Sequence, residues 1–222
     1  MKAPAWSFSS LTLFETCPRK YQAEKVTKEI KFVETEQVKY GKRVHTIAEE
    51  YIRDGKDIPA AFEFMRPHLD GLLGLPGDKY CEVRFGIKQV DGKLEPCDFF
   101  DKQVWFRGQA DLIIVNKRKA FVVDYKTGKN NRSDPRQLAL MAAAVFLKFP
   151  EVETVKSCLL YVVHDAIVPV NYGKEERFKI FSELDTLLHR REEAYASNVW
   201  NPTPNGLCSR WCPVVDCLHN GR

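Results

Sequence analysis

The residues of this chain best suited to chemistry are two aspartates and a lysine within residues 108–128. Asp111 precedes an apolar, β-branched run, Asp124 and Lys126 end a second such run, and the polar residues 116–119 lie between the two. This pattern predicts an antiparallel hairpin with a four-residue turn. Counting outward from the turn sets Asp111 directly across from Asp124, with their Cβ atoms ~5 Å apart.

Two like charges at that distance destabilise a sheet, so a fold that keeps both carboxylates needs a positive group between them. A divalent metal fits this role, and carboxylate oxygens suit Mg²⁺ or Mn²⁺, which polarise phosphate and activate water. Lys126 lies two residues beyond Asp124 and therefore projects from the same side of its strand. On these residues alone, an ordinary ion triad on a sheet surface is an equal alternative.

The spacing around this hairpin resembles the core of the PD-(D/E)XK nuclease superfamily in its RecB-like branch. The residues that carry the resemblance are Gly108 and Asp111, the run Asp124-Tyr-Lys126-Thr-Gly128, Gln137 downstream, Gly41 and His45 upstream, and the segment Cys17-Pro-Arg-Lys-Tyr21. They run from near the start of the chain towards its terminal cysteines, so the resemblance covers most of the chain. Size and cysteine layout are most like those of the small stand-alone RecB-like nucleases of phages and CRISPR adaptation systems.

The resemblance implies an exonuclease that hydrolyses phosphodiester bonds of single-stranded DNA or DNA ends. The ligands that it implies for one or two Mg²⁺ or Mn²⁺ ions are His45, Asp111, Asp124 and the carbonyl of Tyr125. Lys126 would orient or help deprotonate the attacking water, and Gln137 would orient substrate or water. In this family an acidic residue on the preceding strand often lies near the site, which points to Glu82. Pairing with Arg84 on the same face of the strand explains Glu82 as well.

Two predicted helices carry the residues that lie outside the hairpin. A helix from about Glu36 to Ile52 places His45 beside its apolar stripe, where a core histidine bonded to a neighbour is the alternative. A second helix begins at Asp134, with proline in the first helical position and Gln137 three residues beyond the cap. A capping box alone would explain Gln137, and one residue can serve both purposes.

The fold class predicted from these elements is α/β, with a mixed central sheet flanked by helices, as in the restriction-endonuclease-like core. A strand over 81–87, the hairpin, a buried helix over 138–147 and a strand over 154–163 build the sheet, because a strand, helix, strand order makes a right-handed parallel crossover. Residues 91–102 read as a connection. A long amphipathic helix over 174–198 turns Phe178, Phe181, Leu184 and Leu188 inward. The expected organisation is a helical segment over 1–55, a nuclease core over 56–200 and a cysteine tail over 201–222, in one compact unit.

Four of the seven cysteines need an account of their own. Cys208, Cys212 and Cys217 lie in a short, proline-containing tail that cannot bury them in a core, which suggests a metal or cluster. His219 and Cys17 are both candidates for a fourth ligand, and zinc leads from the residues alone. In RecB-like nucleases a 4Fe–4S cluster takes one cysteine from the N-terminal helix and three from the C-terminus, so the resemblance favours iron–sulfur with Cys17 over Zn²⁺. The spacing here, x3 then x4, differs from the family's usual x2 then x5.

Basic residues collect near the predicted site and favour a polyanionic partner. Residues 17–43 hold eight Lys or Arg against four Glu, and residues 117–136 hold seven against two Asp. Such clusters suit a phosphate backbone, although either one alone is also typical of a solvated surface. The side chains predicted to contact DNA are Arg19, Lys20, Lys129, Arg132 and Arg136.

The chain has no apolar run near the ~18 residues of a membrane span and no apolar stretch typical of a secretory signal. We therefore expect no membrane partner and a cytoplasmic location, the host cytoplasm if the chain is phage-encoded. Protein partners in a recombination, replication or adaptation complex are expected. The alternative function is a RecB-like module that binds single-stranded DNA without cutting it, around a structural metal or cluster. Facing carboxylates argue against that alternative, because they repel phosphate.

Overall fold

The computed structural model describes residues 1–31, 33–128 and 134–221. Contacts within the chain divide it into two units, Met1–Glu34 with Glu183–Arg222, and Thr35–Ser182. We call the first the terminal unit and the second the sheet unit. The boundaries expected from the sequence lie at residues 55 and 200 instead. In the structure the helix that carries His45 belongs to the sheet unit, and the two ends of the chain form a unit together.

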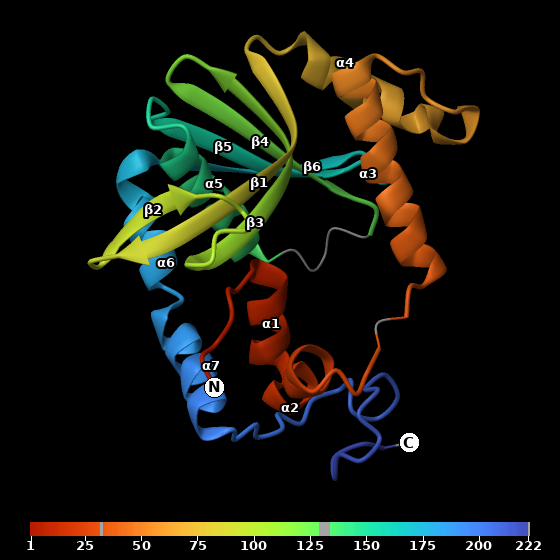
Figure 1. Cartoon of the computed structure of the whole chain (residues 1–222). Helices are drawn as coiled ribbons and strands as arrows, with labels where there is room; N and C mark the ends of the chain where they lie inside the picture. Colours follow the sequence, from red (N-terminus) through yellow and green to blue (C-terminus); the bar gives the residue numbers. More distant parts are fainter. Residues whose placement is uncertain (32, 129–133, 222) are drawn as a thin grey trace. The chain divides into compact units, whose positions relative to one another are not determined.

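A six-stranded sheet forms the centre of the sheet unit (Figure 1), in the order β2-β1-β3-β4-β5-β6. The strands are β1 (Asp78–Val90), β2 (Lys93–Cys97), β3 (Val104–Asn116), β4 (Lys119–Lys126), β5 (Thr154–Tyr161) and β6 (Ala166–Gly173). β4 and β5 run parallel, whereas the other neighbouring pairs are antiparallel. The predicted mixed sheet is therefore confirmed.

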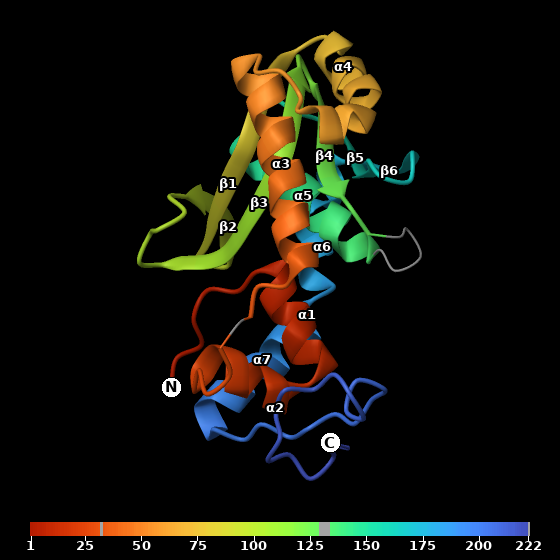
Figure 2. The same cartoon turned by 90° about the vertical axis from the view of Figure 1, so that its right-hand side faces the viewer.

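Helices cover both faces of the sheet (Figures 1 and 2). On one face lie α3 (Glu36–Asp54), the 3-10 helix η2 (Ala60–Met65) and α4 (Arg66–Gly74), whose apolar side chains pack on alternate residues of β3, β4 and β5. On the other lie α5 (Pro135–Lys148) and α6 (Arg177–Ser182), which follows the short η4 (Lys174–Glu176). The core thus fills the two spaces between sheet and helices, and it holds α3 and α5 over opposite faces of β4.

The pairing of β3 with β4 confirms the predicted register. Val115 pairs with Ala120, and the ladder continues outward to Leu112 and Val123. One further pair, Asn116 with Lys119, tightens the turn to two residues. The aspartates stand one position beyond the last recorded pair, where the two strands begin to separate.

Two expectations for the sheet unit are wrong, and one strand was not predicted. Residues 91–102 include β2, which pairs with β1 as a hairpin, rather than only a connection. β6 was not predicted, because Pro169 interrupts its pattern, but an edge strand tolerates proline on its unpaired side. Phe178 is 48% exposed and stacks on the guanidinium of Arg177 instead of facing inward.

The terminal unit contains α1 (Phe8–Thr16), α2 (Pro18–Tyr21), the π-helical turn η1 (Gln22–Val26) and α7 (Asp185–Ser197). Cys17 follows the last residue of α1 and precedes Pro18, the residue that begins α2. The predicted long helix over 174–198 is interrupted at residues 183–184, between α6 and α7. Within the described ranges, no helix combines the length and apolar character that crossing a membrane requires.

Aromatic rings and one buried arginine form the core of the terminal unit. The rings of Phe14, Tyr21, Tyr195 and Trp200 contact one another, with centroids 5.0–6.4 Å apart. Arg191 is 2% exposed; its Nε donates to the Tyr21 hydroxyl and its Nη2 to the Pro4 carbonyl. Each of these guanidinium hydrogen bonds takes the place of one to water, which makes this burial tolerable.

Candidate functional site

The separation of β3 and β4 opens a gap that both aspartates border. The Tyr125 backbone N–H, which follows Asp124, donates to Asp111 Oδ2 at 2.7 Å instead of to a strand carbonyl. The Tyr125 side chain packs into the core below α3, where its ring meets that of His45 edge to face. The Asp111 carboxylate is thereby fixed between the two strands at the end of their ladder.

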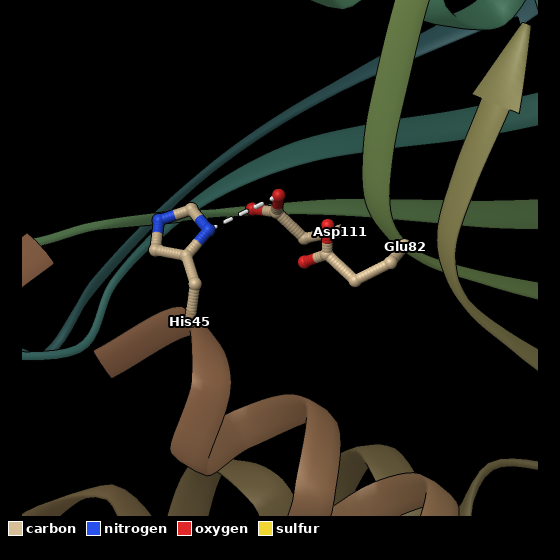
Figure 3. A group of neighbouring side chains, drawn as sticks. All are labelled: His45, Glu82 and Asp111. Atoms are coloured by element: carbon tan, nitrogen blue, oxygen red, sulfur yellow. Dashed lines mark ion pairs between the residues drawn. The ribbon is translucent and has the colours of Figure 1, made fainter. Parts of the chain in front are cut away.

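Three ligand-type side chains gather on the α3 side of this gap. Figure 3 shows the ring of His45, from α3, pointing at Asp111 on β3, with Glu82 of β1 beside them. One ligand atom from each of these three residues lies within 4.8 Å of the others. His45 Nδ1 is 3.1 Å from Asp111 Oδ1. Imidazole and carboxylate groups at this spacing could share one divalent ion.

Glu82 enters this group through an unusual backbone conformation. Its φ is 52°, in the left-handed region, although it lies within β1 between residues paired to Leu112 and Ala110. Its carboxylate accepts a hydrogen bond from the Gln109 side chain, so the predicted pairing with Arg84 is not what holds it. The sequence shows that Glu82 is acidic and precedes the hairpin, but it does not predict the left-handed backbone conformation of this residue.

Asp124 belongs to a second group on the α5 side. Lys126 Nζ lies 2.5 Å from Asp124 Oδ2, and Gln137 Nε2 donates to Asp124 Oδ1 at 2.8 Å. Lys126 Nζ also donates to Gln137 Oε1 at 3.2 Å. The two ends of the Gln137 amide therefore connect the carboxylate and the ammonium. The Asp134 side chain caps α5 at the Arg136 N–H, while the Gln137 side chain faces the site.

The carboxylates of the site repel one another when they are all charged and no metal cation is bound. Burial and then the charge of Asp111 raise the pKa of Asp124 to about 6, although Lys126 opposes the shift. Burial and the charge of Asp111 also raise the pKa of Glu82. For His45, burial lowers the pKa, but the hydrogen bond to Asp111 and the surrounding carboxylates raise it overall. A bound divalent cation would relieve this mutual repulsion.

The predicted DNA-contacting residues have mixed surroundings. Arg19 forms ion pairs with Glu29 and Asp216 in the terminal unit, and Lys20 lies 3.7 Å from Glu24. Arg136 pairs with Asp134 at 2.6 Å. Lys129 and Arg132 lie outside the described residues. DNA contact by these five side chains stays a prediction.

The four cysteines singled out by the sequence line one cavity of the terminal unit. Cys17, Cys208, Cys212 and Cys217 surround it, and His219 also borders it. Backbone N–H groups of Thr203 and Asn205 donate to the sulfurs of Cys17 and Cys208, at 3.5 and 3.4 Å. Among the described residues, no three of these sulfurs lie within 4.8 Å of one another. None of the seven cysteines forms a disulfide bond.

The sequence matches the PD-(D/E)XK nuclease superfamily over residues 5–217. The site agrees with this match, because it combines a hairpin, an adjoining carboxylate and lysine, and a histidine from a covering helix. The chain belongs to the PD-(D/E)XK nuclease superfamily. Nucleases of this superfamily use divalent metals, which agrees with the His45, Glu82 and Asp111 group. The superfamily is thus confirmed, whereas assignment to its RecB-like branch stays a prediction.

Two solved structures are similar to this nuclease fold. The crystal structure of a candidate exonuclease from Eubacterium rectale has a TM-score of 0.53 and 12% identity, covering 93% of this chain and 86% of that one. The crystal structure of a protein named SSO0001 has a TM-score of 0.42 and 17% identity, covering 99% and 89%. At such identities the first shows the fold alone. A search of curated protein sequences found no match.

Proposed function

We propose that this superfamily member is a metal-dependent DNA exonuclease acting on single strands or on DNA ends. The proposal rests on one observation: two groups of polar side chains lie next to each other where the pairing of β3 with β4 ends. His45, Glu82 and Asp111 offer metal ligands, and Asp124, Lys126 and Gln137 form a hydrogen-bonded triad. A site with ligands for a cation beside a positioned amine suits hydrolysis of a phosphodiester.

The donor set fits one or two Mg²⁺ or Mn²⁺ ions, because its members are mostly hard carboxylate oxygens. Asp111, Asp124 and His45 are the proposed ligands with the Tyr125 carbonyl, and Glu82 joins them. A bound ion would polarise the phosphate and offset charge on the leaving oxygen.

The residues of the chain supply the remaining functions. Lys126 would orient the attacking water and stabilise negative charge on the phosphate oxygens, and its ion pair with Asp124 holds the ammonium in place. Gln137 holds both groups through opposite ends of its amide and so fixes their separation. His45, packed against the Tyr125 ring, keeps its imidazole directed at Asp111.

For the terminal unit we propose a 4Fe–4S cluster bound by Cys17, Cys208, Cys212 and Cys217. Zinc is the alternative, because four thiolates also make a closed tetrahedral site. We prefer the cluster because one cysteine of the cavity comes from the N-terminal segment and three come from the tail, which is the layout that the resemblance to RecB-like nucleases implies. Backbone donors to two sulfurs suit thiolate ligands, since such bonds stabilise negative sulfur. We propose an intracellular location as well, because cysteines that form no disulfide bonds are usual in a reducing compartment.

Incubation of the purified protein with labelled single-stranded DNA tests the nuclease function. We expect digestion with Mn²⁺ or Mg²⁺ and none with EDTA. Asp124→Asn should abolish digestion. The control Asp165→Asn removes a 92% exposed carboxylate from the turn before β6 and should leave digestion unchanged. Digestion that persists in EDTA, or in Asp124→Asn, would contradict the proposed site, and binding without digestion would favour the non-cutting module.

A further inference from the structure

Beside the catalytic carboxylates, β1 and β3 carry a second row of polar side chains that the nuclease chemistry does not use. Arg84 is two residues from Glu82 on β1, and it pairs with Gln109, whose side chain bonds Glu82. Arg107 is two residues further along β3. With a rise of ~3.3 Å per residue, this row extends roughly 13 Å from Asp111.

Both arginines lie over the same aromatic ring. The guanidinium carbons of Arg84 and Arg107 lie 5.6 and 5.4 Å from the centroid of the Phe99 ring. Arg107 Nε also donates to the Phe99 carbonyl at 2.8 Å. A guanidinium stacked on a ring keeps its edge N–H groups available for phosphate oxygens.

Glycine brings the segment that carries this ring close to β1. A Cβ at Gly86 would lie 2.5 Å from the Asp98 carbonyl oxygen, so a larger residue would push the segment away. The Asp98 and Asp101 carboxylates accept hydrogen bonds from the backbone N–H groups of Phe100 and Gln103. These bonds hold residues 98–103 in a fixed turn over the strands.

In the described part of the chain, neither Arg84 nor Arg107 forms an ion pair with an acidic side chain. At the end of the row, Phe100 is 71% exposed, and its ring meets Phe99 edge to face with centroids 5.1 Å apart. Positive groups without acidic partners, next to an exposed aromatic ring, are typical of surfaces that bind single-stranded nucleic acid. On such surfaces the phosphates contact the charges and the unpaired bases stack on the ring.

We propose that Arg84, Arg107, Phe99 and Phe100 form a track for the substrate strand, with the arginines on its phosphates and Phe100 stacked on an unpaired base. The track lies entirely within the sheet unit and deepens the proposed function, on which it rests. It names the single-stranded form of the substrate as the one recognised beside the cleavage site. It also separates two contributions, one from charge and one from stacking.

Fluorescence anisotropy of a labelled oligothymidylate, measured in EDTA over a series of salt concentrations, tests the track without cleavage. For Arg84→Gln with Arg107→Gln we expect weaker binding and a flatter dependence of log Kd on log salt, by about 0.7 for each phosphate that the variant no longer neutralises. For Phe100→Ala we expect binding about 5- to 100-fold weaker with an unchanged salt slope, because stacking releases no counterions.

The same unit offers a matched control on α6. Arg177 lies 4.3 Å from the ring centroid of Phe178, which is also exposed, and donates to the Lys174 carbonyl. Arg177→Gln and Phe178→Ala should bind as the unchanged protein does. If the track variants match these controls while the unchanged protein still digests DNA, the track is overturned and the nuclease stands. A protein that neither binds nor digests DNA overturns both.

Discussion

The sheet unit and the terminal unit differ in what lies beneath their functional side chains. In the sheet unit, Asp111 and Asp124 extend from strands whose neighbouring residues are buried between two layers of helices. In the terminal unit, three of the four cavity cysteines lie in residues 198–221, a described stretch without helix or strand. That stretch leaves Trp211, Val215 and Leu218 more than 70% exposed.

This difference teaches how each unit can be damaged. A site built on a packed sheet keeps its geometry when one polar side chain is changed, so such changes affect chemistry before stability. A site built on an irregular segment depends on what it binds, because few apolar contacts hold the backbone. The proposed cluster is therefore expected to fold the tail, whereas the proposed divalent metal is expected to use a site that is already formed.

The largest effect is expected from removing one of the proposed cluster ligands. In Cys212→Ser we expect loss of the visible absorption of anaerobically purified protein, and at least ~100-fold faster protease cleavage within residues 198–221, because metal binding supplies folding free energy there. Cys97→Ser, in β2 and away from the cavity, is the matched control. Spectroscopy, metal analysis and mass spectrometry of the fragments provide the measurements. Colourless protein with stoichiometric zinc would reject iron–sulfur, and an equally resistant tail would contradict the comparison.

The next largest effect concerns the amine of the sheet unit. Lys126→Gln should lower the digestion rate about 100- to 10,000-fold, because it removes the charge beside the reacting phosphate. Thermal unfolding of the variant, measured alongside, separates an effect on chemistry from one on stability, because Lys126 also pairs with the buried carboxylate of Asp124. Lys156→Gln, on an exposed position of the neighbouring strand β5, is the control. A variant with near-normal digestion would remove Lys126 from the mechanism.

Several parts of the sheet unit follow from short stretches of sequence. The hairpin register depends on one turn and two apolar runs, so counting from the turn places Asp111 and Asp124 at the same end. Lys126 follows by strand alternation, and its ion pair with Asp124 agrees. In both cases the relevant contacts are local or are fixed by a regular period. For His45 the helical period gives only its position beside the apolar stripe, and its approach to Asp111 was implied by the resemblance alone.

Other features depend on distant parts of the chain and escape such counting. The left-handed φ of Glu82 and the closeness of residues 98–103 to Gly86 arise from how strands and turns meet in space. The signal for β6 is hidden by Pro169, whose tolerance depends on the strand being at the edge of the sheet. The exposure of Phe178 depends on where the predicted long helix breaks.

Substituting alanine for each of two glycines should have smaller effects, on the free energy of unfolding. The two substitutions test whether close packing stabilises the sheet unit. Gly77 has a φ of 123°, and a Cβ there would lie 2.4 Å from the Val115 carbonyl oxygen, which is backbone and cannot move aside. We therefore expect Gly77→Ala to lower the free energy of unfolding by about 2 kcal/mol or more. Urea denaturation followed by circular dichroism measures the loss.

The matched substitution, Gly71→Ala, lies inside α4, where a Cβ would meet nothing within 4 Å. Here alanine restricts the unfolded chain and suits the helix, so the free energy of unfolding should rise by about 0.5–1 kcal/mol. The two changes add the same methyl group to the same unit, so opposite signs would locate the effect in the close approach of Gly77 to Val115. A loss of stability in Gly71→Ala would contradict the open space that the structure shows around this position of α4. It would also weaken the view that close packing sets the stability of the sheet unit.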